Sequence, residues 1–368
     1  MGGSAWHLDL LSSLGRSALS TNVFGEGDAG GRRLGARRGR VKSVLMVRGV
    51  RKILEVCCGL RAGERVVIVT DYEMDRSVAE LLAAGCAEVG ADPVVVTMAP
   101  REVDGAEPPA AVAAAMAEAH LVLTPVSRSI SHAAATKAAL GRGARVLALS
   151  DFRPEMFYEG GIGADFAAIR PTCDRVARLL TDAGAAHLTS AGGTDVRMDL
   201  RGRSGNSHGC IVDRPGVFSA FPNIEANISP VEGSSEGVIV FDGSIPNFRL
   251  GVMREPVRLE VKGGMIAGIT GGEQAGRLEG LLRERGNLEV YNIAQLAIGL
   301  NPECRQLTGQ MTNDHGALGT VHIGIGTSDN LGGHTRAGLH FDGIMRHPTL
   351  RLDGRPVLDD GQLLLAGC

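Results

Sequence analysis

The pattern of apolar and polar positions changes near residue 190 and predicts two kinds of structure. Between residues 44 and 190, short apolar runs rich in β-branched residues alternate with segments of helical period. One such run spans residues 65–70, and an amphipathic helix follows it with Asp75 placed to cap its first turn. Strands separated by helices favour a mostly parallel sheet covered on both faces. We therefore predict a doubly wound α/β domain at residues 44–190.

Beyond residue 191, strands follow one another with few helices between them. The expected strands span residues 196–200, 237–242, 257–261, 320–326 and 339–344. The expected helices span residues 273–285 and 292–300. Paired glycines at 263 and 264 and the Asp-Gly step at 353 and 354 predict hairpin turns. This half of the chain, residues 191–368, is therefore predicted to form an α+β domain.

Residues 1–43 differ from both of these regions. They are rich in Gly, Ser and Arg and show no sustained hydrophobic period, so we predict a disordered extension there and exclude it from the fold. No G-x-G-x-x-G follows the first predicted strand, and the chain contains no G-x-x-x-x-G-K-[ST]. A loop that cradles nucleotide phosphates is therefore not expected.

Composition and charge narrow the class of protein. The formal net charge is −3 with a pI near 6.4, which favours neither a nucleic-acid nor a membrane partner. No apolar stretch reaches the ~18 residues of a membrane span, and the first residues lack the pattern of a secretory signal. The seven cysteines form no C-x-x-C pair, so we expect reduced thiols rather than a zinc ribbon. A cytoplasmic enzyme or binding protein is the expectation.

Candidate metal ligands gather in the second half of the chain. If residues 339–344 form a strand, His340 and Asp342 project from one face, as an imidazole and a carboxylate that bind a divalent metal would. His322 alternates with apolar residues and stands beside glycines, which allow close approach. Glu225 follows a proline-containing turn. Taken singly, each has an ordinary structural explanation. The H-x-D pair is also typical of a surface turn, His322 of a buried structural histidine, and Glu225 of a solvated carboxylate.

Other histidines are less informative. His315 and His334 are expected on loops, where either could line a cleft, and His132 is expected at the start of a helix. Local spacing assigns none of them a chemical role.

Several segments, in the same order along the chain, resemble the thermophilic-type leucyl aminopeptidases, the aminopeptidase T family. These segments are Ser129-Ile-Ser-His132, Gly193-Thr-Asp195, Phe221-Pro-Asn-Ile-Glu225, Pro230-Val-Glu-Gly233, Asp242-Gly-Ser244, Asn292-Ile-Ala-Gln-Leu296, Gly319-Thr-Val-His322 and His340-Phe-Asp342. The resemblance covers the chain from about residue 44 to its end. It implies an α/β N-terminal domain, a metal-bearing C-terminal domain, a homodimer and a cleft shielded from bulk water.

The resemblance also implies a ligand set. Members of that family hold two divalent metals, and the matching positions here are Glu225, His322, His340 and Asp342. A further family glutamate falls where this sequence has Gln295. A ligand that bridges two cations should be anionic, because two neighbouring dications repel strongly and a neutral amide offsets none of that repulsion. We therefore expect one ion, or a weakly bound second one.

The first functional hypothesis is a metal-dependent, aminopeptidase-like hydrolase. With Zn²⁺, Co²⁺ or Mn²⁺, such a site lowers the pKa of bound water and delivers hydroxide to an amide carbonyl. The substrate would be a small molecule or short peptide, cleaved at an N-terminal residue or a related small amide. Glu225 and Glu232 are the carboxylates expected to transfer protons.

Two alternatives remain open. Dihydroxypyridine ring-cleaving dioxygenases resemble the same family and use an H-x-D pair with one further histidine, close to where Gln295 falls. With Fe²⁺, two histidines and a carboxylate leave positions open for O₂ and a chelating aromatic, and His322 would supply the second imidazole. The other alternative is a metal-poor, non-catalytic relative that kept the fold and lost peptidase competence at Gln295.

Overall fold

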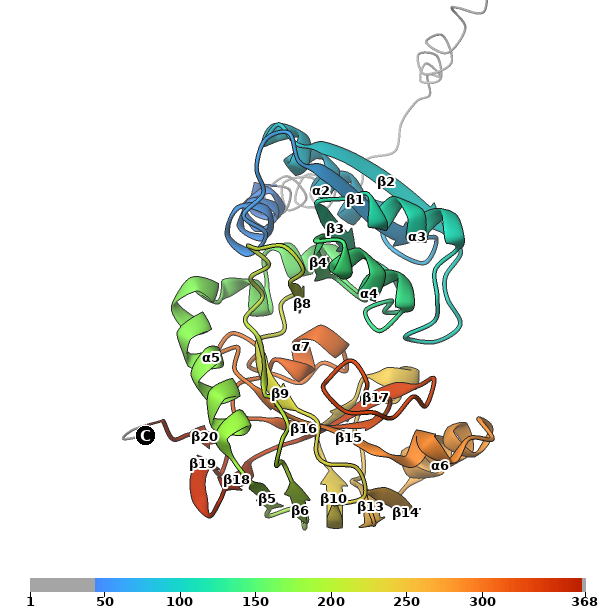
Figure 1. The fold of residues 1–368 in the computed structure, drawn as a ribbon, viewed down its shortest axis with the longest axis vertical. Coiled ribbons are helices and arrows are strands. Elements are labelled where there is room, and N and C mark those ends of the chain that lie inside the picture. Colours follow the sequence, from blue (N-terminus) through green and yellow to red (C-terminus); the bar gives the residue numbers. More distant parts are fainter. Residues whose placement is uncertain (1–43, 366–368) are drawn as a thin grey trace, which may run out of the picture. The chain divides into compact units, whose positions relative to one another are not determined.

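The computed structural model describes residues 44–365, so the disordered extension predicted at residues 1–43 lies outside the described residues. Within residues 44–365, no helix combines the length and the apolar character that crossing a membrane requires. The described chain forms three sheets, one parallel and two antiparallel (Figure 1).

The first sheet confirms the predicted doubly wound α/β class. Its five strands are all parallel, in the order β2-β1-β3-β4-β8. They are β1 (Arg65–Asp71), β2 (Asp92–Met98), β3 (Leu121–Thr124), β4 (Arg145–Ala148) and β8 (Phe218–Ala220). The helical elements of this part are residues 44–51, η1 (Lys52–Cys57), α2 (Arg76–Glu88), α3 (Ala110–Ala117) and α4 (Ala134–Gly141). The predicted cap is present, since the Asp75 carboxylate accepts a hydrogen bond from Ser77 N at 2.9 Å.

The second sheet has eight antiparallel strands in the order β14-β13-β10-β6-β5-β18-β19-β20. These strands are β5 (Ala185–Ser190), β6 (Asp195–Asp199), β10 (Glu236–Phe241), β13 (Val257–Lys262), β14 (Met265–Thr270), β18 (Pro348–Leu352), β19 (Arg355–Asp359) and β20 (Gln362–Leu363). Both predicted hairpins are present, because β13 pairs with β14 and β18 pairs with β19. The helix α6 (Glu273–Arg283) matches the helix predicted at 273–285 and packs against β13 and β14.

The third sheet has seven strands in the order β12-β11-β17-β16-β15-β9-β7. These strands are β7 (Asn206–His208), β9 (Glu225–Ile228), β11 (Ser244–Ile245), β12 (Gly251–Val252), β15 (Ile293–Gly299), β16 (Val321–Gly326) and β17 (His340–Met345). The remaining helical elements are η2 (Pro154–Phe157), η3 (Gly160–Gly163), α5 (Phe166–Asp182), η4 (Asn247–Arg249), η5 (Leu288–Tyr291) and α7 (Met311–His315).

One predicted element is wrong. Residues 292–300, expected to be a helix, form the strand β15 between β9 and β16. Every residue of β15 is buried, and all of its side chains except that of Gln295 are small or apolar, so the sequence shows no alternation. A buried strand and a buried helix are not distinguished by periodicity in so short a run.

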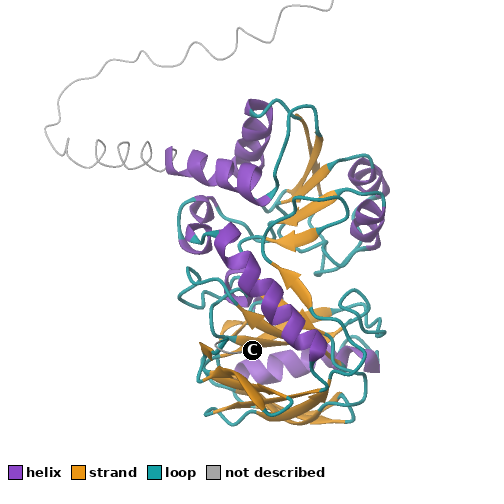
Figure 2. Cartoon of the chain, turned by 60° about the vertical axis from the view of Figure 1, so that its left-hand side comes forward, coloured by secondary structure: helices purple, strands orange, loops and turns teal. Residues whose placement is uncertain are grey.

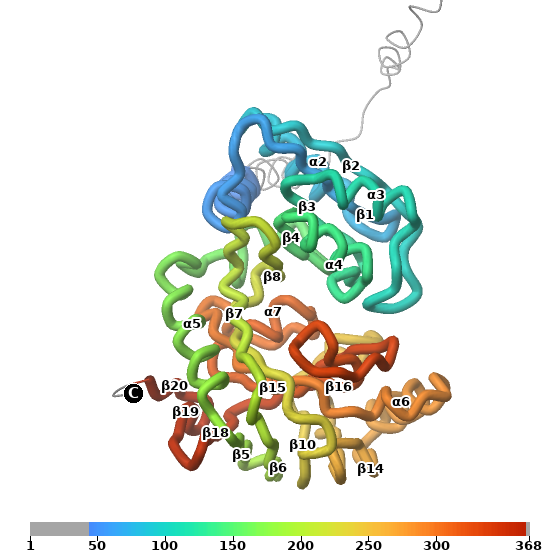
Figure 3. Tube along the Cα trace, in the orientation of Figure 1, coloured from blue at the N-terminus to red at the C-terminus, as the bar shows by residue number. Residues whose placement is uncertain are grey.

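The chain crosses between sheets more than once. After α5 it enters the eight-stranded antiparallel sheet as β5 and β6, and then forms β7 at the edge of the seven-stranded sheet. It returns to the parallel sheet as β8 before β9 (Figure 3). The helix α5, the long diagonal helix near the centre of Figure 2, contacts η1 as well as β7 and β9. The division into domains at residue 190 stays a prediction.

Candidate functional site

Neighbouring strands of the seven-stranded sheet carry the polar residues that the sequence singles out. Glu225 lies on β9, His322 on β16, and His340 and Asp342 on β17. β15 lies between β9 and β16 and contributes Gln295. Alternate residues along a strand project to the same face, and the strand register brings all five side chains to one face of the sheet.

The opposite face of β16 is apolar, as predicted, with Val321, Ile323 and Ile325 all fully buried. On the polar face, a glycine in β16 leaves room for the side chains of the two adjacent strands. A Cβ atom on Gly324 would lie 2.7 Å from Gln295 Cβ and 2.8 Å from His340 Cε1, so only glycine allows this packing. The space beside His322 that the sequence predicted is therefore filled by side chains from the adjacent strands.

A cavity of about 510 Å³ opens onto these polar side chains. Its volume is within the ~300–1,000 Å³ typical of small-molecule sites. Loops from the parallel sheet form part of its wall and contribute Asp104, Ser129, Ser131, His132 and Ser150. The site is thus built from two parts of the chain that are far apart in sequence.

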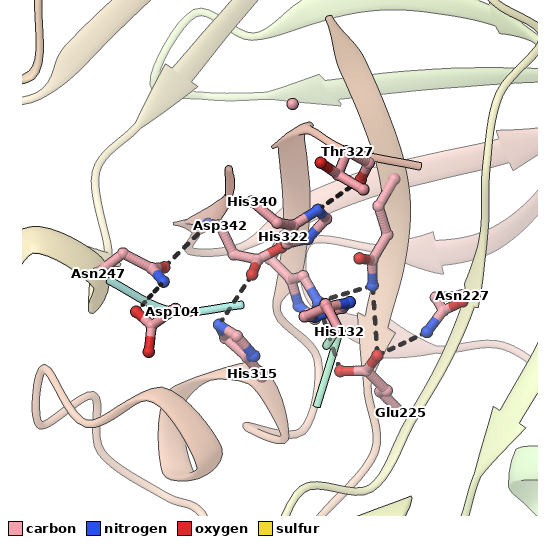
Figure 4. Close-up of polar contacts among 12 residues, drawn as sticks. Asp104, His132, Glu225, Asn227, Asn247, His315, His322, Thr327, His340 and Asp342 are labelled. Atoms are coloured by element: carbon pink, nitrogen blue, oxygen red, sulfur yellow. Dashed lines mark hydrogen bonds and ion pairs between the residues drawn. The ribbon is translucent and has the colours of Figure 1, made fainter. Parts of the chain in front are cut away.

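The H-x-D pair is held in one orientation. His340 Nδ1 lies 2.8 Å from the Thr327 carbonyl oxygen, which accepts its N–H and leaves Nε2 to face Asp342 Oδ1 at 3.3 Å (Figure 4). Burial lowers the pKa of the His340 imidazole, but the Asp342 carboxylate and the Thr327 carbonyl outweigh it and the pKa is raised. Burial would raise the pKa of Asp342, yet His340 and His315 hold it well below its usual range.

The Glu225 carboxylate is surrounded by amides and imidazoles. Asn223 donates to Oε2 at 2.6 Å and Asn227 to Oε1 at 2.7 Å. His322 Nε2 lies 3.4 Å from Oε2. Burial raises the pKa of Glu225, but the histidines around it, chiefly His322, and the Asn223 hydrogen bond outweigh burial and lower it. Burial brings the pKa of His322 to about 4, so a neutral imidazole faces an ionised carboxylate.

A chain of hydrogen bonds ties the H-x-D pair to the parallel sheet. Asp342 N donates to Asn247 Oδ1 at 3.1 Å, and Asn247 Nδ2 donates to Asp104 Oδ2 at 3.2 Å (Figure 4). Asp104 in turn accepts from Ser129 N at 2.8 Å. This chain fixes the backbone of β17 against the loop that carries His132.

Two histidines that the sequence left without a role also reach the cavity. His132 precedes α4, and its ring stacks on that of His340 with centroids 5.1 Å apart. Its pKa is lowered to about 4, mainly by burial and also by His340. His315, at the end of the short helix α7, lies with Nε2 3.5 Å from Asp342 Oδ2 and stacks on His322. Neither position carries a local signal, because spacing within a loop does not reveal which strand the loop faces.

Glu225, His322, His340 and Asp342 are thus brought together, whereas Glu232 is not among the residues that line the cavity. Its carboxylate pairs with Arg203, accepts from His334 N at 2.6 Å, and lies 3.3 Å from Ser328 Oγ. Through these contacts Glu232 and Arg203 stabilise the loop at residues 328–334.

We expect Glu232→Gln to lower the free energy of unfolding by about 1–3 kcal/mol, because the Arg203 side chain is only 9% exposed and loses its anion. Cobalt titration of the variant should match the wild type, since Glu232 lies outside the cavity. Chemical denaturation followed by circular dichroism measures the first effect. Weakened cobalt binding with unchanged stability would contradict this prediction and would place Glu232 near the metal.

A family model described as 2,5-dihydroxypyridine 5,6-dioxygenase (NicX) matches residues 46–365. The chain belongs to this family. A curated 2,5-dihydroxypyridine 5,6-dioxygenase from Pseudomonas putida KT2440 is 27% identical over 195 residues, which cover 50% of this chain and 56% of the relative. The aligned part therefore spans about half the length of that relative.

Solved structures agree on the fold. The 2,5-dihydroxypyridine dioxygenase from Pseudomonas putida KT2440 superposes with a TM-score of 0.75 at 21% identity, covering 88% of this chain and 97% of that one. AmpT from Thermus thermophilus superposes with a TM-score of 0.65 at 15% identity, covering 88% and 100%. The resemblance to aminopeptidase T is confirmed at the level of the fold.

The expectation of an aminopeptidase-like hydrolase or metalloprotease is wrong. The family model and the curated relative both carry the name of a dioxygenase. The motifs behind that expectation place imidazoles and carboxylates on one face of one sheet, and this framework does not specify the reaction. The dioxygenase alternative is the better supported, and the cluster of glutamate and histidine side chains is suited to a divalent metal.

Proposed function

We propose that this chain is a ring-cleaving dioxygenase that uses ferrous iron and acts on 2,5-dihydroxypyridine or a closely related hydroxylated N-heterocycle. The observation that carries the proposal is the buried donor set on the cavity floor of a chain whose family match spans residues 46–365. The set comprises Glu225, His315, His322, His340 and Asp342.

The chemistry of these donors suits ferrous iron. Imidazoles combined with a carboxylate are the ligands of non-haem iron centres that leave positions free for other molecules. His340 donates its Nδ1–H to a backbone carbonyl, the outer hydrogen bond that orients most metal-binding histidines. Two ionised carboxylates, Glu225 and Asp342, would balance the charge of a buried dication.

When bound, the ferrous ion supplies a redox centre that couples oxidation of the electron-rich ring to reduction of O₂, so both oxygen atoms enter the product without another reductant. The chain's own residues bind and orient the substrate. His132 is a neutral imidazole with one ring nitrogen engaged by Asn330, which leaves the other for a polar group of the substrate. Burial of the five donor side chains limits the access of bulk water to them.

Oxygen uptake tests this proposal. Protein stripped of metal, reloaded anaerobically with Fe²⁺ and then given air should consume one O₂ for each 2,5-dihydroxypyridine opened, followed by an oxygen electrode and by loss of ring absorbance. Metal-free and Zn²⁺-loaded protein should be inactive, because zinc has no redox chemistry. Iron-loaded protein that consumes no O₂ with any of a panel of hydroxylated pyridines and phenols would exclude the activity.

A further inference from the structure

The helix α7 brings a third imidazole, His315, against the donors on the sheet. Glu225, His315 and His322 each offer a ligand atom, and these three atoms lie within 4.8 Å of one another. All three residues are buried, with His322 at 0% and His315 at 8% exposure. Imidazole nitrogens and carboxylate oxygens are common ligands of first-row divalent metals, so three such donors close together could bind one ion.

Gln295 does not complete this set. Its Nε2 donates to Glu225 Oε1 at 3.3 Å and lies 3.4 Å from His322 Nε2. An amide NH₂ group has no lone pair to offer a cation, so in this orientation Gln295 holds Glu225 in place without binding metal. A centre in this chain therefore needs its second imidazole from another element.

Among these donors, two buried ring nitrogens have no hydrogen-bond partner within the described residues: His315 Nε2 and His322 Nδ1. His315 Nε2 lies 3.5 Å from Asp342 Oδ2, yet the geometry is not that of a hydrogen bond. Leaving a buried polar atom unpaired costs about 1–3 kcal/mol, so such atoms point to a partner of another kind. The two rings also stack, with centroids 4.7 Å apart and planes 24° apart, which holds them side by side.

We propose that His315 is a direct ligand of a divalent metal in this chain, together with Glu225 and His322. Its imidazole takes the place of the metal-binding side chain that is missing at position 295. The His340–Asp342 pair borders this ion through Asp342 Oδ2, the carboxylate oxygen nearest to His315. The proposal rests on the proposed function only for the identity of the ion as ferrous iron. Any imidazole-binding dication tests the ligand set.

The test uses Co²⁺ alone, titrated into metal-stripped, full-length protein and followed by calorimetry and by visible absorption. His315→Asn should weaken Co²⁺ binding at least about tenfold and change the absorption band, because one nitrogen ligand is lost. His347→Asn is the matched control, since the His347 side chain is 74% exposed, and its titration should equal that of the wild type.

Asparagine at 315 keeps a polar side chain beside Asp342, so a merely structural role for His315 predicts wild-type Co²⁺ affinity and spectrum in the variant. That outcome would overturn the proposal. The wild-type protein gives a second measurement that needs no variant to fold: paramagnetic proton NMR of its Co²⁺ complex should contain strongly shifted ring signals from His315. Their absence, with the histidines otherwise assigned, would also overturn it.

Failure of this inference is distinguishable from failure of the proposed function, because Co²⁺ binding is measured without substrate or oxygen. Wild-type protein that binds Co²⁺ through His315 but consumes no O₂ when loaded with iron defeats the proposed function and leaves His315 as a ligand. Iron-dependent O₂ uptake by the wild type, together with unchanged Co²⁺ binding in His315→Asn, would support the proposed function and overturn the assignment of His315 as a ligand.

Discussion

Asp342→Asn is expected to lower kcat/KM for iron-dependent ring opening by more than about 100-fold, since loss of a mere outer-sphere partner already costs ~10–100-fold. Asparagine keeps the size of the side chain but removes one of two negative charges from a buried site. It also deprives His340 and His315 of their neighbouring carboxylate. Oxygen consumption at several substrate concentrations measures the effect.

The surface pair His187–Asp195 provides a matched control. Asp195 Oδ1 lies 2.8 Å from His187 Nε2, and the Asp195 side chain is 71% exposed. Asp195→Asn removes the same charge from the same kind of pair outside the cavity, so its kcat/KM should stay at the wild-type value. Equal activities of the two variants, at equal metal content, would remove Asp342 from the active site.

The parallel sheet was predictable from local sequence because its central strands are buried on both sides. Runs such as Arg65–Asp71 are too short and too rich in β-branched residues for a helix, and the helix α2 that follows carries a cap and an apolar stripe. The same reasoning failed at Ile293–Gly299, where only the first and the sixth residue are β-branched. Its place between β9 and β16 is decided by tertiary pairing, which local propensity does not encode.

The donor set was predictable only in part. The shared face of His340 and Asp342 follows from the period of a strand, and so does the separation of His322 from its apolar neighbours. That these strands and β9 lie side by side is a long-range property, which the resemblance to a known family supplied. His315 and His132 reach the cavity from α7 and from the loop before α4, and nothing in their spacing reveals it.

The reaction was the least predictable part. Hydrolytic and oxidative metal sites both use imidazoles and carboxylates on a rigid sheet, and they differ in the ion and in the positions left open. In this chain Gln295 argues against a pair of bridged ions, because its amide contacts Glu225 and carries no charge to separate two cations. A centre for one ion fits the dioxygenase family better than a dinuclear hydrolase.

Arg145→Met is expected to lower the free energy of unfolding by about 3 kcal/mol, at the lower end of the range for breaking a buried ion pair. Arg145 begins β4, and its side chain is 6% exposed. It pairs with Glu64 at 2.6 Å and donates to the Cys58 carbonyl, so one side chain ties the parallel sheet to the turn after η1. Methionine preserves the volume of the stem but leaves the Glu64 carboxylate and the Cys58 carbonyl without this donor.

Arg142→Met is the matched control for this change. Arg142 lies three residues away and pairs with Glu118 at 3.2 Å, but the two side chains are 63% and 74% exposed. Water and salt screen such a pair, so its loss should cost less than about 1 kcal/mol. Urea denaturation followed by circular dichroism should therefore separate the two variants clearly. Coincident transitions would mean that Arg145 contributes no more than a surface arginine, and that the contacts of η1 with α5 hold this helix to the fold instead.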